Sequence, residues 1–328
     1  MTPETVPAAN PSLQDFVGGS PRQIAKRLLY ATRPRFFPAS ILPVLAGTVW
    51  GFRVLGNFDF AIFMLALLGV ICAHAGANVL NDAADDSGGT DRRNEDRIYP
   101  YTGGSRFIQT GIMSTASMVQ LGIMLLAIAA ILGFVLFIAK GPMILLFGLT
   151  GLALAVLYSY SPVRLNANGL GEVAVAVAFG VLPVTGAAWL QSGIVNTGVL
   201  MFSLPISAWV AAVILINEVP DIDADGATGK RTLPVRFGLV GTANLYIGIQ
   251  GFAVAAIALL TIMGSLPLAS PILPIGLMLL AFRAASAIKS GVEDRVELTR
   301  AIESTLAIHT IGSLWLCTCV LFMAVWGA

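Results

Sequence analysis

Two short acidic clusters interrupt a sequence that is otherwise strongly apolar. The first covers residues 78–91 and the second covers residues 217–225. Together with Glu95 and Asp96, they hold ten of the chain's 18 acidic residues. Each cluster repeats an Asn and two Asp at intervals of four, which places them along one face of a helix end: Asn78, Asp82 and Asp86 in the first, and Asn217, Asp221 and Asp225 in the second.

Such acidic faces are unfavourable by themselves. Carboxylates four residues apart on a helix repel each other, and the carboxyl end of a helix disfavours anions through its dipole. A cation is therefore needed. Mg2+ prefers oxygen ligands and usually binds through one or two carboxylates, water and substrate phosphates. The two clusters predict a site in which Mg2+ ions hold a diphosphate as a leaving group. The simpler alternative is a pair of solvated acidic loops.

Basic residues follow both clusters closely: Arg92, Arg93, Arg97 and Arg106 after the first, and Lys230, Arg231 and Arg236 after the second. Guanidinium groups bind phosphate oxygens in a fork, and lysine supplies a compact charge. We expect Arg97, Arg106, Lys230 and Arg231 to bind diphosphate. The alternative is that these residues reflect only the basic character of cytoplasmic loops.

The elements that must position these clusters are membrane-spanning helices. Hydrophobic residues make up 56% of the chain and charged residues 11%, and the mean hydropathy is +0.83. A soluble fold could not bury so much apolar surface. The apolar runs are about 20 residues long, as a helix that crosses a bilayer requires. We predict nine spans, near residues 38–56, 60–80, 115–138, 142–160, 170–190, 199–217, 240–263, 269–289 and 305–326.

The basic residues indicate the orientation of these spans. If the amino terminus is cytoplasmic, all of the 19 Lys and Arg except Arg53 and Lys140 lie on the cytoplasmic side, as the positive-inside rule expects. Both acidic clusters then face the cytoplasm. We predict a multi-pass protein of the cell inner (cytoplasmic) membrane, with the lipid bilayer as a partner and its site facing the cytoplasm. The net charge of +1 gives no indication of nucleic-acid binding.

The chain is expected to form one domain. Residues 1–21 have no apolar core of the kind found in signal peptides, and we interpret them as a disordered leader. Residues 22–328 form the predicted transmembrane domain, which begins with an amphipathic helix on the membrane surface at residues 22–30. The three cysteines and two histidines all fall inside predicted spans, so neither a disulfide framework nor a zinc site is indicated.

Several motifs resemble those of the UbiA superfamily of intramembrane aromatic prenyltransferases, from about Arg33 to the end of the seventh span. Residues 78–91 fit its pattern Asn-x-x-Asn-Asp-x-x-Asp-x-x-x-x-x-Asp, and residues 221–238 are similar to its second acidic motif. Residues 33–47, 158–162 and 169–172 resemble its flanking segments. The hydroxybenzoate branch has the last Asp of this motif at the position of Gly89, whereas the last Asp in this chain is Asp91. This spacing most resembles the 1,4-dihydroxy-2-naphthoate polyprenyltransferases.

This resemblance implies an all-α, UbiA-type bundle of nine transmembrane helices. It also implies Mg2+-dependent transfer of a polyprenyl group from polyprenyl diphosphate to an aromatic acceptor, 1,4-dihydroxy-2-naphthoate, in menaquinone biosynthesis. Asp85, Asp221, Lys230 and Tyr158 are the implied catalytic residues, with Tyr158 facing the allylic cation; an interfacial tyrosine is the alternative reading. The candidate metal ligands are Asn78, Asn81, Asp82, Asp85, Asp91, Asn217, Asp221 and Asp225. The alternative for Asp82 is that it contacts the other ligands and not the metal.

Two departures from the family pattern leave the acceptor open. Ala83 stands where the family often has an aromatic residue, and residues 217–220 read Asn-Glu-Val-Pro where an Asn pair and an Arg are more usual. Other acceptors, such as 4-hydroxybenzoate, homogentisate or another quinone or lipid precursor, therefore stay possible. A transporter of an anionic solute or a cation is a different class, but transporters place charged sites near the bilayer midplane. A non-catalytic lipid-binding protein would be expected to lack some metal ligands.

Overall fold

The computed structural model describes residues 10–89, 96–159 and 162–326, and all regular secondary structure in these ranges is helical. The all-α prediction is therefore confirmed for the described part of the chain. The helices are α1 (Pro21–Ala31), α2 (Pro38–Leu55), α3 (Phe60–Gly88), α5 (Thr115–Lys140), α6 (Met143–Ser159), α7 (Gly171–Ala176), α8 (Leu182–Ser192), α9 (Thr197–Asn217), α10 (Ile222–Ala227), α11 (Leu233–Ile262), α12 (Ile272–Ser290) and α13 (Arg295–Trp326). A π-helical turn, η4 (Val177–Val181), joins α7 to α8.

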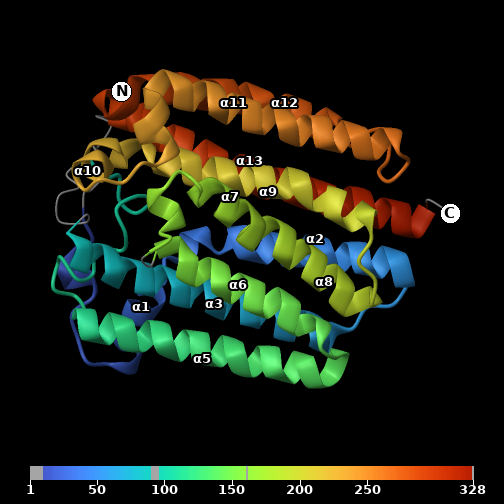
Figure 1. Ribbon diagram of the computed structural model, residues 1–328, viewed down its shortest axis with the longest axis horizontal. Helices are drawn as coiled ribbons and strands as arrows, with labels where there is room; N and C mark the ends of the chain where they lie inside the picture. Colours follow the sequence, from blue (N-terminus) through green and yellow to red (C-terminus); the bar gives the residue numbers. More distant parts are fainter. Residues whose placement is uncertain (1–9, 90–95, 160–161, 327–328) are drawn as a thin grey trace.

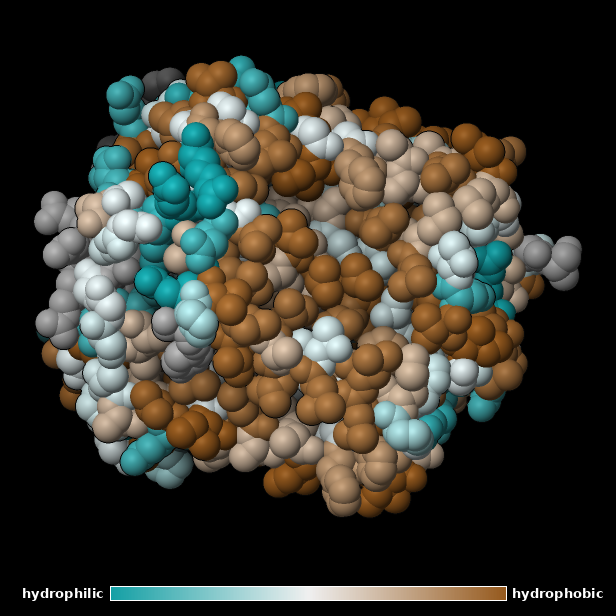
Figure 2. Space-filling model, in the orientation of Figure 1, coloured by the Kyte–Doolittle hydropathy of each residue, from teal (hydrophilic) through white to brown (hydrophobic). Residues whose placement is uncertain are grey.

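Multiple helices are long and apolar enough to cross a membrane. In the described residues there are seven such helical stretches, and one of them, Ile272–Trp326, contains both α12 and α13. The apolar helix α6 is shorter. Figure 2 shows a broad hydrophobic band on one face, with hydrophilic residues gathered mainly at the end that carries α10. The chain is thus a multi-pass helical membrane protein, while the count of nine spans stays a prediction.

The long helices lie roughly along one axis, with α10 at one end of the molecule and the carboxyl terminus near the other (Figure 1). Central and peripheral helices differ sharply in burial. The most apolar part of Thr197–Ala227 is 78% buried within the protein, whereas that of Thr115–Lys140 is only 17% buried. An apolar helix that stays exposed is suited to contact with lipid. The central α9 therefore delivers the second acidic cluster from the core of the bundle.

Helix α3 extends well past its predicted span of residues 60–80. It continues to Gly88 and ends at Gly89, whose φ of 77° is readily adopted by glycine at a helix end. The whole polar run from Asn78 to Asp86 is consequently helical. This extension fixes the direction of each polar side chain relative to its neighbours.

The amino-terminal segment packs onto the same end of the bundle. Residues 1–9 of the predicted leader lie outside the described residues. In the remainder, Leu13–Asp15 form a short 3-10 helix, and the buried ring of Phe16 contacts Phe107 and Tyr30. Helix α1 follows at the place predicted for the amphipathic helix and begins with a capping box formed by Ser20 and Gln23.

Close packing of α2 on α8 uses a Gly-x-x-x-Gly pair. A Cβ added at Gly51 would lie 2.6 Å from the carbonyl oxygen of Ala188, and one at Gly47 would overlap the backbone of Val184. Small residues at four-residue spacing let two membrane helices approach closely. These glycines therefore set the distance between α2 and α8.

Replacement of Gly51 by Ala tests this packing. The added methyl group meets helix backbone, which cannot rotate away, so the G51A variant should lose about 1–3 kcal/mol of stability. The control is G133A on α5, where an added Cβ meets nothing within 4 Å. Thermal unfolding in detergent should show a lower midpoint for G51A and no loss for G133A. Equal midpoints would contradict the proposed close contact.

Candidate active site

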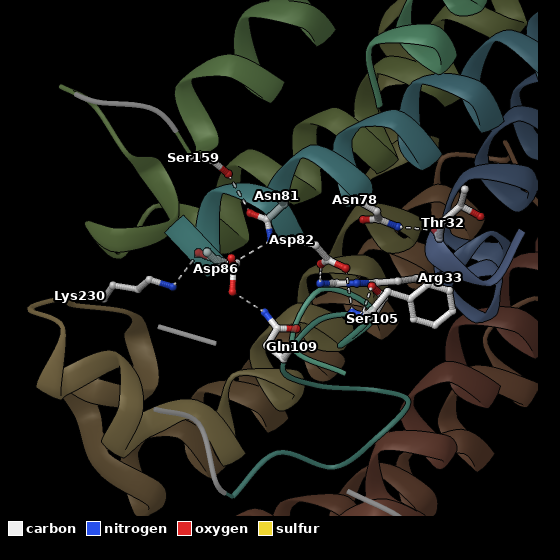
Figure 3. Close-up of polar contacts among 12 residues, drawn as sticks. Thr32, Arg33, Asn78, Asn81, Asp82, Asp86, Ser105, Gln109, Ser159 and Lys230 are labelled. Carbon is white, nitrogen blue, oxygen red and sulfur yellow. Dashed lines mark hydrogen bonds and ion pairs between the residues drawn. The ribbon is translucent and has the colours of Figure 1, made fainter. Parts of the chain in front are cut away.

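The two acidic clusters meet at a single ammonium group. Nζ of Lys230 lies 3.5 Å from Oδ1 of Asp85 on α3 and 3.2 Å from Oδ1 of Asp225 on α10. Figure 3 shows Lys230 reaching toward the polar end of α3. The structure thus brings together three of the residues predicted from the sequence, although Asp85 on α3 is far in the chain from Asp225 and Lys230.

Lys230 is held as a charged group in this position. The side chain is buried, with 8% of the residue exposed. Burial lowers the pKa of Lys230, but the carboxylates of Asp85, Asp225 and Asp221 outweigh it, so the pKa stands above its ordinary value. The ammonium group therefore stays protonated and supplies the counter-charge that the sequence requires.

A second set of contacts orients the Asp85 carboxylate. Nδ2 of Asn81 donates a hydrogen bond to Oδ2 of Asp85 at 3.0 Å, and Oγ of Ser159 donates to Oδ1 of Asn81 at 2.9 Å. Ser159 ends α6, which ties this helix to α3 (Figure 3). The sequence reasoning did not assign Ser159 to the site. Its only signal was its place in a segment that resembled a family motif.

A different face of α3 anchors protein segments. Asp82 forms an ion pair with Arg33, and its Oδ2 accepts a hydrogen bond from the backbone N–H of Ser105 at 2.8 Å. Nδ2 of Asn78 donates to the carbonyl oxygen of Thr32 at 3.1 Å. Asp86 accepts from Gln109 at 3.2 Å. This face, spaced by four, holds the chain before α2 and the loop before α5, while Asn81 and Asp85 lie toward Lys230.

The second cluster is carried by a sharp turn after α9. Asn217 is the last residue of α9, and Asp221 ends the 3-10 helix η5 (Val219–Asp221). Asp225 is buried on α10, with 5% of the residue exposed. The backbone N–H of Lys230 donates to the carbonyl oxygen of Asp225 at 2.9 Å, which turns the lysine back over the cluster.

Arg231 and Arg236 fix the turn between α10 and α11. The backbone N–H of Arg231 donates to Ala167 O at 2.7 Å, and its own carbonyl accepts from Nε of Arg236 at 2.8 Å. The guanidinium of Arg236 also donates to Asn168 O at 2.7 Å. These bonds join the second cluster to the loop between α6 and α7. They leave the side chain of Arg231 exposed.

The other predicted phosphate-binding residues lie in the loop before α5. A guanidinium nitrogen of Arg97 donates to Oδ1 of Asn10 at 2.9 Å, and the buried Arg106 adopts a positive φ of 63°. The structure therefore places Arg97 against the amino-terminal segment. The predicted ligand Asp91 lies outside the described residues.

Tyr158 lies beside two acidic residues that the sequence reasoning did not assign to the site. Glu172 on α7 and Glu218 after α9 are buried, and Tyr158 interacts electrostatically with both of them and with Asp85. In the sequence, Glu218 was counted in the second acidic cluster and noted as a departure from the family pattern, but it was given no role. Its proximity to Glu172 depends on the packing of α7 against α9, for which the sequence carries no spacing signal.

The donor atoms suit a hard divalent cation. Among the described residues, no three or more His, Cys, Asp or Glu side chains gather into a ready-made metal site. However, Asp85 and Asp225 point their oxygens at the same cationic group from two separate helices. Mg2+ binds in such places through few carboxylates and completes its coordination with water and substrate phosphates. The residues present fit that requirement.

The bundle matches the fold of solved membrane proteins. A UbiA homologue from Archaeoglobus fulgidus, solved bound to DMAPP and Mg2+, aligns with a TM-score of 0.65 at 18% identity, covering 90% of this chain and 99% of that chain. At this identity the likeness establishes the fold, which is the UbiA-type helical bundle implied by the sequence motifs.

The family assignment rests on the sequence match. The profile of the UbiA prenyltransferase family matches residues 40–299, so the chain belongs to this family and is a prenyltransferase. The 1,4-dihydroxy-2-naphthoate octaprenyltransferase of Mycobacterium tuberculosis is 34% identical, with 83% of this chain and 89% of that protein covered. The enzyme of the same name from Mycobacterium leprae is 31% identical, with 79% and 84% covered.

Removing the Lys230 charge tests its role as the counter-ion. The K230M variant leaves Asp85 and Asp225 without their shared cation, and loss of such hydrogen bonds to charged groups should cost about 2 kcal/mol. The thermal midpoint in Mg2+-free detergent should fall, whereas exposed Lys289 offers K289M as a control without this effect. An unchanged midpoint for K230M would show that the carboxylates do not need the ammonium group.

Proposed function

We propose that this prenyltransferase moves a polyprenyl group from polyprenyl diphosphate to 1,4-dihydroxy-2-naphthoate in menaquinone biosynthesis, with Mg2+ as cofactor. The observation that carries this proposal is the meeting of Asp85 and Asp225 at one cation, at the polar end of an apolar bundle. The names of the two mycobacterial relatives support the acceptor. The Archaeoglobus homologue, which was solved bound to DMAPP and Mg2+, supports the class of donor and the cofactor.

The proposed metal ligands are Asn81, Asp85, Asp221 and Asp225, together with Asp91 from the first motif. Asp82 already contacts Arg33 and Ser105 N–H, so we assign it to holding α3 and its neighbours in place. Asn78 and Asn217 stay candidates next to the ligands. When bound, Mg2+ would neutralise the diphosphate and so make it a better leaving group.

Cationic side chains supply the rest of the neutralisation. Lys230 is protonated and buried at the meeting point, where its third N–H group can donate a hydrogen bond to a diphosphate oxygen. Arg231 follows it with an exposed guanidinium, and Arg97 and Arg106 are further candidates from the loop before α5. Such preorganised charges stabilise negative charge as it grows on the leaving group when the allylic C–O bond breaks.

The surrounding apolar helices suit the step that follows, in which the aromatic acceptor attacks the allylic cation. An allylic cation is attacked by water unless water is excluded, and an apolar bundle excludes it. The aromatic face of Tyr158 can stabilise a cation that forms near Asp85. The apolar prenyl tail would lie along the helices, whose apolar side chains contact it as lipid tails would.

We further propose nine membrane crossings, with the amino terminus and the site on the cytoplasmic side of the inner membrane, and residues 22–328 acting as one domain. Arg53 and Lys140, the two basic residues expected on the opposite side, contact Ser265 O and Asp59 respectively. Both partners lie in or next to connections remote from α10. This distribution agrees with the positive-inside rule.

Two aspartates of α10 offer a matched test of the metal site. Asp225 is buried against Lys230, whereas Asp223, two residues earlier, is exposed. D225N should lower Mg2+-dependent prenyl transfer at least a hundredfold, because it removes a carboxylate that faces the leaving group. D223N should retain activity within about threefold. Transfer of labelled prenyl groups in membranes, at a range of Mg2+ concentrations, measures both; similar activities for the two variants would exclude the proposed ligand set.

An acceptor panel tests the proposed substrate. Membranes containing the protein are supplied with labelled polyprenyl diphosphate, Mg2+ and one of 1,4-dihydroxy-2-naphthoate, 4-hydroxybenzoate or homogentisate. A prenylated product is expected with the dihydroxynaphthoate. Product formed only from one of the other two acceptors would refute the assignment to menaquinone biosynthesis.

A further inference from the structure

Two carboxyl groups are buried together beside the proposed diphosphate site. Glu172 lies in the first turn of α7 and Glu218 follows α9, and they are only 4% and 9% exposed. The two side chains interact with each other, and both interact with the ring of Tyr158. Two carboxyl groups are therefore held out of water at one place next to an aromatic ring.

Each member of the pair also has an oxygen that lacks a partner. Oε1 of Glu172 and Oε2 of Glu218 are buried without a hydrogen bond, and so is Oδ1 of Asn166. A buried polar atom left unsatisfied costs about 1–3 kcal/mol. Carboxyl and amide carbonyl oxygens accept hydrogen bonds, so the missing partner is a hydrogen-bond donor. Hydroxyl groups on a ligand meet this requirement.

Gly171 lies among Asn166, Glu218 and Tyr158. A Cβ added at Gly171 would lie 3.4 Å from Cα of Asn166 and 3.7 Å from both Oε1 of Glu218 and Cε2 of Tyr158. The carboxyl group of Glu218 and the ring of Tyr158 thus lie around the same point. Polar acceptors next to an aromatic ring suit a ligand that is itself a hydroxylated ring.

Contacts connect this pair to the diphosphate site. Tyr158 interacts electrostatically with Glu218, Glu172 and Asp85. The next residue, Ser159, donates to Asn81, which in turn holds the Asp85 carboxylate. The end of α6 therefore lies next to both groups of residues. A ligand held by the pair would sit close to the reacting end of the donor.

We propose that Glu172 and Glu218 bind the ring hydroxyl groups of the aromatic acceptor. This inference rests on the proposed function and names the acceptor part of the same site. The hydroxyl groups donate to the two unpartnered oxygens, and the ring contacts Tyr158. A phenol that donates to a carboxylate has a more electron-rich ring, which favours its attack on the allylic carbon.

Steady-state kinetics of E172Q and E218Q test this proposal. Glutamine keeps the size of the side chain but removes its charge and adds donors in place of an acceptor. The KM for dihydroxynaphthoate should rise at least tenfold in each variant, while the KM for polyprenyl diphosphate stays within twofold. The control is E297Q, since Glu297 is exposed on α13 and pairs with Arg300. With an acceptor whose hydroxyl groups are methylated, wild type and variants should have the same KM.

The G171A variant provides a test that does not disturb the carboxyl groups. Its methyl group makes ordinary contacts with Tyr158 and Glu218, so the fold is kept while the surroundings of the proposed acceptor site become more crowded. The acceptor KM should again rise without a change in the donor KM. If wild type transfers prenyl groups but none of the three variants alters the acceptor KM, this inference alone is wrong. If wild type transfers to no acceptor in the panel, the proposed function fails and this inference fails with it.

Discussion

Neutralisation of buried carboxylates at one end of an apolar bundle is the constraint on which the rest of this structure depends. Charges taken out of water are costly unless they are paired and hydrogen-bonded. Lys230 meets this need for Asp85 and Asp225, and Arg33 meets it for Asp82. A bound diphosphate with divalent metal would add charges of both signs at the same place. The electrostatic requirement of the fold and that of the proposed chemistry are therefore satisfied by the same residues.

This constraint accounts for the local architecture. Helix α3 extends beyond its apolar part so that its polar face can bind Arg33, Ser105 and Gln109. The sharp turn after α9 and the short α10 direct Asp225 toward α3. The bonds of Arg236 to the loop after α6 hold this turn in place. Polar contacts thus hold the described segments before α2, before α5 and between α10 and α11.

The sequence predicted the helices and the polar residues well, because apolar length and charge placement are local properties that a bilayer imposes. The duplicated acidic clusters, with basic residues after each, predicted that the two clusters share one site. Residue spacing alone could not predict which face of α3 turns toward Lys230. Four-residue spacing singled out Asn78, Asp82 and Asp86, whereas the ammonium group pairs with Asp85, which Asn81 orients. Only the family resemblance had pointed to Asn81 and Asp85. The approach of Glu172 to Glu218 depends on tertiary packing of α7 on α9, so no pattern along the chain could reveal it.

The most direct test of the central claim is a double-mutant cycle on Asp85 and Asp225, with Mg2+-dependent binding of a non-hydrolysable polyprenyl diphosphate analogue as the measured quantity. If the two carboxylates serve one site, D85N and D225N should each weaken binding strongly in the presence of Mg2+. The double variant should then be much less impaired than the sum of the two free-energy losses predicts. Without Mg2+, the four proteins should differ little. Fully additive losses, or equal losses with and without Mg2+, would contradict the claim that the two clusters form one metal-dependent diphosphate site.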